Sequence, residues 1–176
     1  MSVFDNHERY GNVSRFFHWG MTLLLSVQFL TAIARFLFED SWLDELMWGI
    51  HKPLGFLLLL FVILRFAWAL INLSRRPASV SKAALIGHKA LYVLMLVIPA
   101  LAMMRQYGSG KAFSPLGLPL MDGFDTGKID WMVGLGNLLH GELGWLLFAF
   151  VIGHVVMTVW HRIRQNPVDV MARMWR

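Results

Sequence analysis

Four long apolar runs, at residues 16–38, 48–71, 83–104 and 138–160, constrain the fold more than any other feature of this sequence. A helix of about 22–24 residues crosses an apolar layer of about 30 Å with some tilt. The runs do not alternate in polarity and are far too long for barrel strands, so they predict spanning helices. With 57% hydrophobic residues and a mean hydropathy of +0.54, the chain has the composition of an integral membrane protein.

We therefore expect an all-α integral membrane protein whose single domain, residues 1–176, is an antiparallel, left-handed bundle of four transmembrane helices. The side that carries both termini, here called the inner side, is rich in Lys and Arg, whereas the outer side is not. The positive-inside rule predicts cytoplasmic N- and C-termini and a multi-pass protein of the bacterial inner membrane. The net charge of +5 then reflects sidedness in the lipid bilayer, and we expect no nucleic-acid partner. No signal-peptide pattern precedes the first run, so we expect it to be retained.

Two segments outside the runs carry their own expectations. The connection at 105–137 is rich in Gly and Pro, which predicts turns. It could be a docking surface, a lid or simply a solvated loop. The segment 164–176 is predicted to be an interfacial tail, because Asn166 followed by Pro167 is typical of the start of a short helix.

Histidines in the apolar runs are the candidate functional residues, because ionisable side chains at membrane depth are costly. His140 and His154 are fourteen residues apart on the last run. That spacing places them within about 40° of one face of a helix and about 21 Å apart along it. By depth, the other histidines of the runs fall on the inner side (His18, His88 and His161) or on the outer side (His51).

Pairing by depth gives an outer pair, His51 with His140, and an inner site in which His154 faces His18 or His88. Two neutral imidazoles across a helix bundle are the axial ligands that a b-type haem iron needs. The chain has no Cys, which excludes disulfides, Cys-ligated iron–sulfur clusters and c-type haem attachment. The alternatives are histidines that only hydrogen-bond between helices, a zinc or copper site, and a transporter or scaffold without redox activity.

A porphyrin also needs space and partners for its propionates. Gly55 and Gly144 lie four residues after His51 and His140, one turn along each helix, where a flat ring would press against the backbone. Cationic side chains near the membrane edges are the propionate candidates. They are Arg15, Arg65 and Lys89 on the inner side, and Lys52 and Arg105 on the outer side.

Several short motifs around these histidines resemble the bacterial cytochrome b561 family, which is similar in turn to the haem-b subunits of nickel hydrogenases and formate dehydrogenases. The resemblance covers nearly the whole chain. The motifs are Arg15-Phe16-Phe17-His18-Trp19, His51-Lys52-Pro53-Leu54-Gly55, Gly87-His88-Lys89-Ala90-Leu91-Tyr92, His140-Gly141-Glu142-Leu143-Gly144 and Gly153-His154.

The resemblance implies two bis-histidine b haems in a four-helix bundle, with His18 and His154 on the inner iron and His51 and His140 on the outer iron. It also implies a ubiquinone site beside the inner haem. His161 is the candidate quinone-side residue, and His88 is a propionate or quinone neighbour.

Members that resemble this chain include superoxide oxidases, so superoxide is one expected donor on the outer side. Cationic side chains available for it are Lys52, Arg105, Lys111 and Lys128, although acids outnumber bases in the outer loops. The alternative function is that of a haem-b membrane subunit that exchanges electrons between quinone and a separate periplasmic redox protein.

Overall fold

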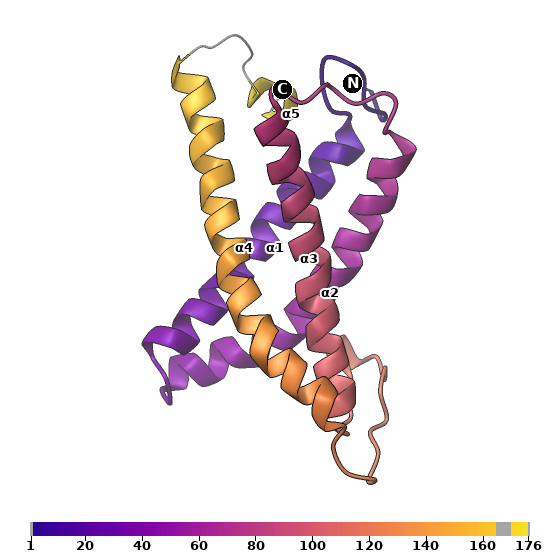
Figure 1. Cartoon of the computed structure of the whole chain (residues 1–176), viewed down its shortest axis with the longest axis vertical. Helices are drawn as coiled ribbons and strands as arrows, with labels where there is room; N and C mark the ends of the chain where they lie inside the picture. Colours follow the sequence, from indigo (N-terminus) through magenta and orange to yellow (C-terminus); the bar gives the residue numbers. More distant parts are fainter. Residues whose placement is uncertain (1, 165–169, 176) are drawn as a thin grey trace.

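The structure, a computed structural model, describes residues 2–164 and 170–175. Its helices are α1 (Asn12–Leu37), α2 (Trp42–Ile71), α3 (Lys82–Gly108), α4 (Asp130–Arg164) and the short α5 (Ala172–Trp175), with one 3-10 turn, η1 (Pro115–Gly117). The predicted all-α architecture is confirmed, since four helices are long and apolar enough to cross a membrane. They run alternately up and down, and both termini lie at the same end (Figure 1).

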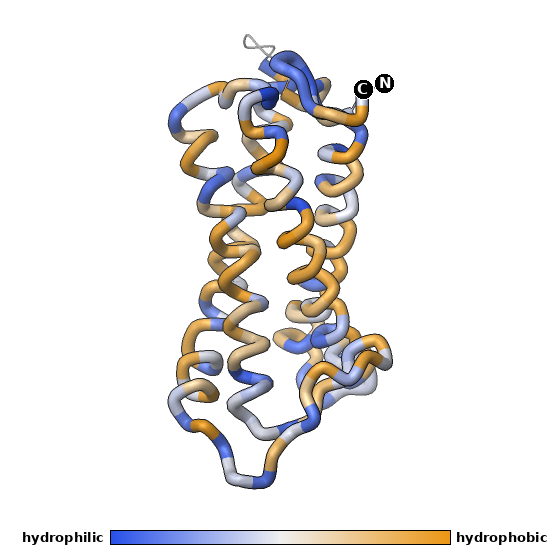
Figure 2. The backbone as a smooth tube through the Cα atoms, turned by 90° about the vertical axis from the view of Figure 1, so that its right-hand side faces the viewer, coloured by the Kyte–Doolittle hydropathy of each residue, from blue (hydrophilic) through white to orange (hydrophobic). Residues whose placement is uncertain are grey.

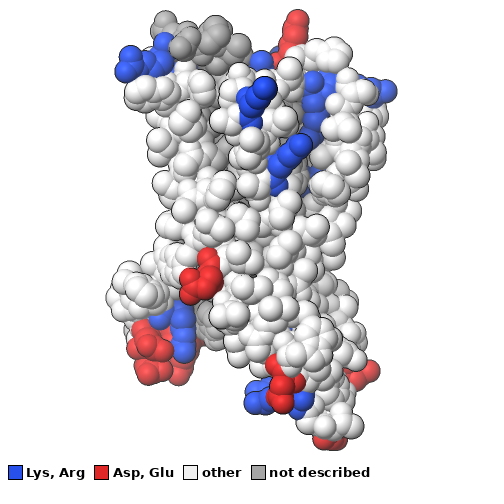
Figure 3. All heavy atoms as spheres, viewed as in Figure 1, with Lys and Arg blue, Asp and Glu red and all other residues white. Residues whose placement is uncertain are grey.

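Hydropathy divides the molecule into three zones along its long axis. The middle of the bundle is apolar, and the polar residues collect toward both ends (Figure 2). On the face seen in Figure 3, Lys and Arg crowd the end with the termini, and most of the visible Asp and Glu lie toward the other end. This asymmetry is the charge pattern from which the positive-inside rule predicts the orientation, and the cytoplasmic location of the termini stays a prediction.

All four spanning helices begin earlier than the apolar runs predicted, and the largest differences are at α2, which begins at Trp42 rather than residue 48, and α4, which begins at Asp130 rather than residue 138. The early start of α2 has a local cause. The Ser41 side chain accepts a hydrogen bond from the Asp44 backbone N–H at 3.2 Å, and Asp44 and Glu45 lie in the first helical turn. An N-cap and first-turn acids stabilise helix in a polar sequence that hydropathy alone treats as a connection.

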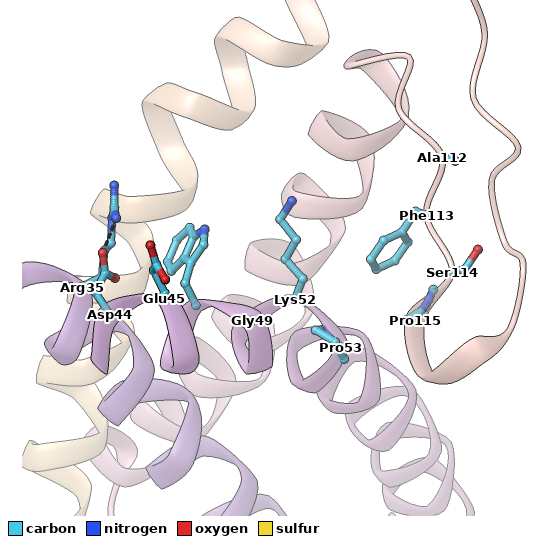
Figure 4. A pocket seen from close by; sticks show the side chains of 11 residues that line it. Arg35, Asp44, Glu45, Gly49, Lys52, Pro53, Ala112, Phe113, Ser114 and Pro115 are labelled. Carbon is cyan, nitrogen blue, oxygen red and sulfur yellow. Dashed lines mark hydrogen bonds and ion pairs between the residues drawn. The ribbon is translucent and has the colours of Figure 1, made fainter. Parts of the chain in front are cut away.

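The first turns of α2 lie across the outer end of the bundle, and the helix changes direction around Pro53 (Figure 4). Proline has no backbone N–H and crowds the preceding turn, which is a common cause of helix bends. The bend carries α2 from the outer surface into the bundle. His51 is therefore on the last turn before the crossing segment.

The bundle consists of two helical hairpins, α1 with α2 and α3 with α4, and most contacts between helices lie within these pairs. One apolar core joins the hairpins, and it is formed by Met21, Leu58, Val62, Leu94, Met95, Ile98 and Leu147. Many other apolar side chains of the four helices are exposed on the molecular surface. Lipid-facing helices show this pattern, because hydrocarbon solvates apolar side chains.

The inner end is closed by the N-terminal segment, which the sequence analysis treated only as a polar extension. Asp5 is 3% exposed and accepts a hydrogen bond from the Gly11 backbone N–H at 2.8 Å. Its other carboxylate oxygen pairs with Arg76 at 3.2 Å, and its backbone N–H donates to the Asn72 side chain. These contacts tie the segment before α1 to the end of α2.

The C-terminal helix α5 packs on the protein, with the Trp175 ring 5.1 Å from that of Trp19 and the Trp19 indole N–H donating to the Met174 carbonyl. The predicted helix start at Asn166 and Pro167 lies outside the described residues. The outer connection between α3 and α4, residues 109–129, is shorter than the predicted 105–137 and is mostly irregular. It contains η1 and a bridge between Phe113 and Met121, and Gly110 and Gly123 adopt positive φ angles where they approach each other.

Candidate functional site

Between the two hairpins lie two pairs of histidines, and within each pair the two rings face each other. In the outer pair, the ring centres of His51 and His140 are 6.2 Å apart with an interplanar angle of 80°. In the inner pair, the ring centres of His18 and His154 are 6.3 Å apart with an angle of 62°. Each pair takes one histidine from the α1–α2 hairpin and one from α4. A ligand held by either pair would therefore bridge the hairpins.

These separations can be tested against the geometry of a metal between two imidazoles. A metal–imidazole bond is about 2.0–2.1 Å long. The centre of an imidazole ring lies about 1.1 Å from its own nitrogens by ordinary covalent geometry. Two imidazoles on opposite sides of one metal then have ring centres about 6.3 Å apart. Both pairs match this value, so their spacing fits axial ligation of a haem iron.

The third inner histidine, His88 of α3, has a ring centre 5.4 Å from that of His154. This separation is shorter than that of two rings with a metal between them, and His88 belongs to the same hairpin as His154. The geometry therefore favours His18 over His88 as the partner of His154, a choice that depth alone left open. His88 is exposed on the surface of the bundle, where a lipid-soluble molecule can reach it.

Both rings of the outer pair have hydrogen-bond partners that fix their orientation. Nδ1 of His140 lies 3.1 Å from the backbone carbonyl oxygen of Ile98 in α3. Nδ1 of His51 lies 2.7 Å from the buried hydroxyl of Thr31 in α1. Metal-ligating histidines usually donate their second ring N–H to such groups. These contacts leave Nε2 of each ring as the nitrogen available to a metal.

A glutamine from α1 lies against the outer pair. The Gln28 amide nitrogen is 3.1 Å from Nε2 of His51 and 3.2 Å from its backbone oxygen. Its amide oxygen is buried without a hydrogen-bond partner among the described residues. A buried polar atom without a partner is costly. The contact of the amide nitrogen with Nε2 of His51 covers the nitrogen that is available to a metal. The amide would have to release Nε2 for that nitrogen to bind one.

The inner pair has different surroundings. Nη2 of Arg65 lies 3.3 Å from Nδ1 of His18, and Nε of Arg65 donates to the Tyr92 hydroxyl at 3.3 Å. The guanidinium also lies over the Tyr92 ring. Within the described residues, no hydrogen bond reaches a ring nitrogen of His154. The inner pair therefore has a cation, Arg65, beside a ring nitrogen. The Nδ1 atoms of the outer pair instead face neutral hydrogen-bond acceptors, the Thr31 hydroxyl and the Ile98 carbonyl.

The predicted glycines differ in what surrounds them. A Cβ at Gly144 would meet no atom within 4 Å, and one at Gly55 would meet only the Gln28 amide at 3.4 Å. Open space beside His140 and His51 fits the flat ring that the sequence analysis expected. Gly20, which lies two residues after His18 and was not among the predicted glycines, instead packs against Phe61, since a Cβ there would lie 2.7 Å from the ring.

The predicted cations lie at the expected ends, and Arg65 is the one in contact with a histidine pair. Arg15 and Lys89 are on α1 and α3 at the inner end, and among the described residues neither side chain bonds to a histidine. Arg105 packs its stem against Gly136 of α4. His161 is on the last turns of α4, and within the described range no hydrogen bond or ring contact joins it to the inner pair.

An outer cavity of about 530 Å³ lies beside the outer pair, between the start of α2 and the loop residues 112–115 (Figure 4). Its lining includes Lys52, Trp48 and an ion pair between Arg35 and the buried Asp44. The indole of Trp48 stacks on His51, with ring centres 4.7 Å apart and planes 17° from parallel. Trp48 therefore connects this cavity to a histidine of the outer pair.

Three residues at the outer pair were missed by sequence reasoning. Gln28 and Thr31 are polar residues inside an apolar run, at the depth of His51, and polar side chains at membrane depth usually have partners. That signal could have found them. Trp48 gave no such signal, because its stacking on His51 depends on the packing of the first turns of α2.

Comparison with known proteins identifies the family of the chain. The sequence model of the family described as prokaryotic cytochrome b561 matches residues 9–176. Cytochrome b561 homolog 2 of Escherichia coli (strain K12) is 26% identical over 184 aligned residues, which cover 99% of this chain and 95% of that protein. Among the described residues, no group of three or more His, Asp or Glu side chains is placed to hold a bare metal ion.

Proposed function

Because the chain belongs to the prokaryotic cytochrome b561 family, whose members transfer electrons through haem b in membranes, we propose that it carries single electrons across the bilayer between two haem-binding histidine pairs. The observation that carries the proposal is the pair geometry. Each pair bridges the two hairpins with a ring separation that fits axial ligation. The two pairs are about 21 Å apart along α4, from their fourteen-residue spacing.

The residues of each site have separate tasks. His51 and His140 would hold the outer haem, and His18 and His154 would hold the inner one. When bound, the two haems supply one-electron chemistry at two depths of the membrane. Gly55 and Gly144 leave space beside the outer pair. Arg15, Arg65 and Lys89 are the propionate partners inside, and Lys52 and Arg105 are those outside.

Ubiquinone is the electron acceptor that we propose on the inner side, because it resides in the membrane. One quinone takes up two electrons and two protons, so it needs proton donors as well as the histidine pair. His88 is exposed beside His154, and His161 lies two turns farther along α4. Imidazole can donate a proton near neutral pH, so both residues are candidate proton donors to quinone.

Superoxide is the donor that we propose on the outer side. Two superoxide anions would each give up one electron and leave as dioxygen, which balances the reduction of one quinone. The outer cavity brings Lys52 close to Trp48, which stacks on His51. Arg35 in the same cavity is already paired with Asp44, so Lys52 is the cation we assign to attract the anion. Arg105, Lys111 and Lys128 do not line this cavity but add positive charge to the outer side of the chain.

A second candidate donor is a periplasmic redox protein. The outer loop around η1 exposes three leucines, with 64% of Leu116, 56% of Leu118 and 45% of Leu120 accessible. An exposed apolar segment beside the outer cavity favours protein docking. In that case the chain acts as the haem-b membrane subunit of a larger assembly.

The test uses the purified chain in detergent or nanodiscs. We expect two b haems per chain, and reduction of a ubiquinone analogue when a superoxide generator is added. Superoxide dismutase should abolish that reduction. A colourless protein after expression with ample haem would refute the electron-transfer proposal. Two haems without superoxide-driven quinone reduction would instead favour the protein-donor alternative, which co-purification with a periplasmic partner would support.

A further inference from the structure

A short relay of hydrogen bonds connects His51 to the backbone of α1. Oγ1 of Thr31 lies 2.6 Å from the carbonyl oxygen of Gln28 and 2.7 Å from Nδ1 of His51. A carbonyl oxygen only accepts hydrogen bonds, and a hydroxyl group has one hydrogen to donate. Thr31 therefore donates to Gln28, and its oxygen accepts the hydrogen of His51 Nδ1. The relay fixes the tautomer of His51.

The contacts on the other side of the ring agree with this tautomer. With the proton on Nδ1, Nε2 of His51 is an acceptor, and it faces the Gln28 amide nitrogen at 3.1 Å. The same nitrogen also lies near the backbone oxygen of His51. A flipped amide would place its oxygen against two acceptors, so the network permits one arrangement. Nε2, the nitrogen that must bind the metal, is therefore unprotonated and has a lone pair to donate.

The relay is shielded from water. Thr31 is 0% exposed, and its hydrogen-bond partners belong to α1 and α2. In such surroundings a hydrogen bond is electrostatically stronger than in water. A ligating histidine whose second N–H donates to an acceptor is a more basic ligand, which stabilises the more positive oxidation state of the metal.

The inner pair has the opposite arrangement. A guanidinium has only donors, so the contact of Arg65 with Nδ1 of His18 makes that nitrogen an acceptor. A nearby positive charge favours the state that has gained an electron. The two pairs thus differ in electrostatics, although their ring separations are nearly equal.

We propose that Thr31 is a positioning residue that makes His51 a strong donor ligand and so lowers the reduction potential of an iron held by the outer pair, while Arg65 raises that of an iron held by the inner pair. Electron transfer from the outer to the inner pair is then downhill. This inference rests on the proposed function, because it requires that both pairs bind haem.

The test compares two substitutions at one position. Thr31→Val keeps the shape and removes the hydroxyl, and Thr31→Ser keeps the hydroxyl. Haem absorbance is followed in a potentiometric titration of each purified, haem-loaded variant. We expect Thr31→Val to raise the lower of the two midpoint potentials and to leave the upper one unchanged, while Thr31→Ser behaves like the unaltered protein. Arg65→Gln should lower the upper potential, and Arg65→Lys should preserve it.

Loss of haem is an informative outcome too. Partners of metal-ligating histidines contribute about 10–100-fold to metal affinity. Weaker haem retention in Thr31→Val, together with full retention in Thr31→Ser, would support the relay. Equal losses or equal shifts in both variants would overturn it, because packing would then explain them. Unchanged potentials in Thr31→Val, or a shift of the upper potential alone, would also overturn it.

The wild-type spectrum separates the two levels of the argument. A chain that lacks haem, or one in which His51→Ala keeps both haems, refutes the proposed function itself. A wild-type chain with two haems whose potentials ignore the loss of the Thr31 hydroxyl refutes only the role of Thr31.

Discussion

The outer and inner histidine pairs have ring separations of 6.2 Å and 6.3 Å, yet their hydrogen bonds differ in kind. In the outer pair, both Nδ1 atoms face acceptors, the Thr31 hydroxyl and the Ile98 carbonyl. In the inner pair, Nδ1 of His18 faces the Arg65 guanidinium. Spacing therefore fits both pairs for the same kind of ligand, and the surrounding groups give each pair a different chemical character.

The difference has a consequence for haem loading. The outer pair already presents metal-binding nitrogens with free lone pairs and needs only the Gln28 amide to withdraw. At the inner pair, the contact of Arg65 holds the proton of neutral His18 on Nε2, the nitrogen that must bind the metal. Arg65 has to give up this one hydrogen bond when His18 ligates through Nε2, while its positive charge stays beside the inner pair.

The largest expected effect comes from removing one ligand of one pair. His51→Ala or His140→Ala should abolish the outer haem and leave the inner one, halving the haem-to-protein ratio. His18→Ala or His154→Ala should do the same to the inner haem. Pyridine haemochrome analysis of purified protein measures the ratio. Full haem content in any of these variants would show that the substituted histidine is not a haem ligand and would refute the assignment of the two pairs.

A smaller effect should separate ligands from quinone-side residues. His88→Ala should leave both haems in place and slow quinone reduction by about 100-fold, the lower range for a lost proton donor. Stopped-flow reoxidation of the reduced haems by a quinone analogue measures the rate. His7→Ala, in the N-terminal segment, is the matched control. If His88→Ala removes the inner haem, His88 is a ligand and the choice of His18 is wrong.

The space beside the outer pair can be probed without touching a ligand. Gly144→Leu should fill the open region next to His140 and lower outer haem content. Gly141→Leu is the control, because Gly141 has equally open surroundings but is turned about 100° from His140 around α4. The haem-to-protein ratio of both variants is the readout. Equal content in both would place the porphyrin elsewhere.

The smallest effect on the pairs should come from a change in the N-terminal segment that closes the inner end of the bundle. Asp5→Ala removes the acceptor of the Gly11 backbone N–H and the ion-pair partner of Arg76. Loss of a buried, charged hydrogen-bond partner costs about 1–3 kcal/mol. Thermal unfolding should therefore begin at a lower temperature, with both haem potentials unchanged. A change in the reduction potential of the inner haem would show that the N-terminal segment is coupled to the inner pair.

Much of the fold could be predicted because the hydrocarbon of a membrane permits few backbone conformations. An apolar run as long as residues 48–71 must be helical, since the backbone has no other way to satisfy its hydrogen bonds in lipid. The predicted ends were less accurate. Residues 42–47 are polar enough to resemble a connection, but the Ser41 cap and the acids after it extend α2 to Trp42.

The candidate histidines could be placed by depth for a similar reason. Helical rise converts sequence position into depth, so His51 and His140 fall at one level and His18, His88 and His154 at another. Depth carries no information about which helices are neighbours across the bundle. The rivalry between His18 and His88 could therefore be addressed only by the ring separations of 6.3 Å and 5.4 Å from His154.

The sequence by itself determined the four membrane helices and the two levels of histidines, because hydropathy and helical periodicity are local properties. Only the tertiary structure decided that Thr31 and Ile98 face the outer pair while Arg65 faces the inner one. The physical reason is that these contacts join different helices. They depend on the rotation and bending of each helix against its neighbours, which no stretch of sequence specifies alone.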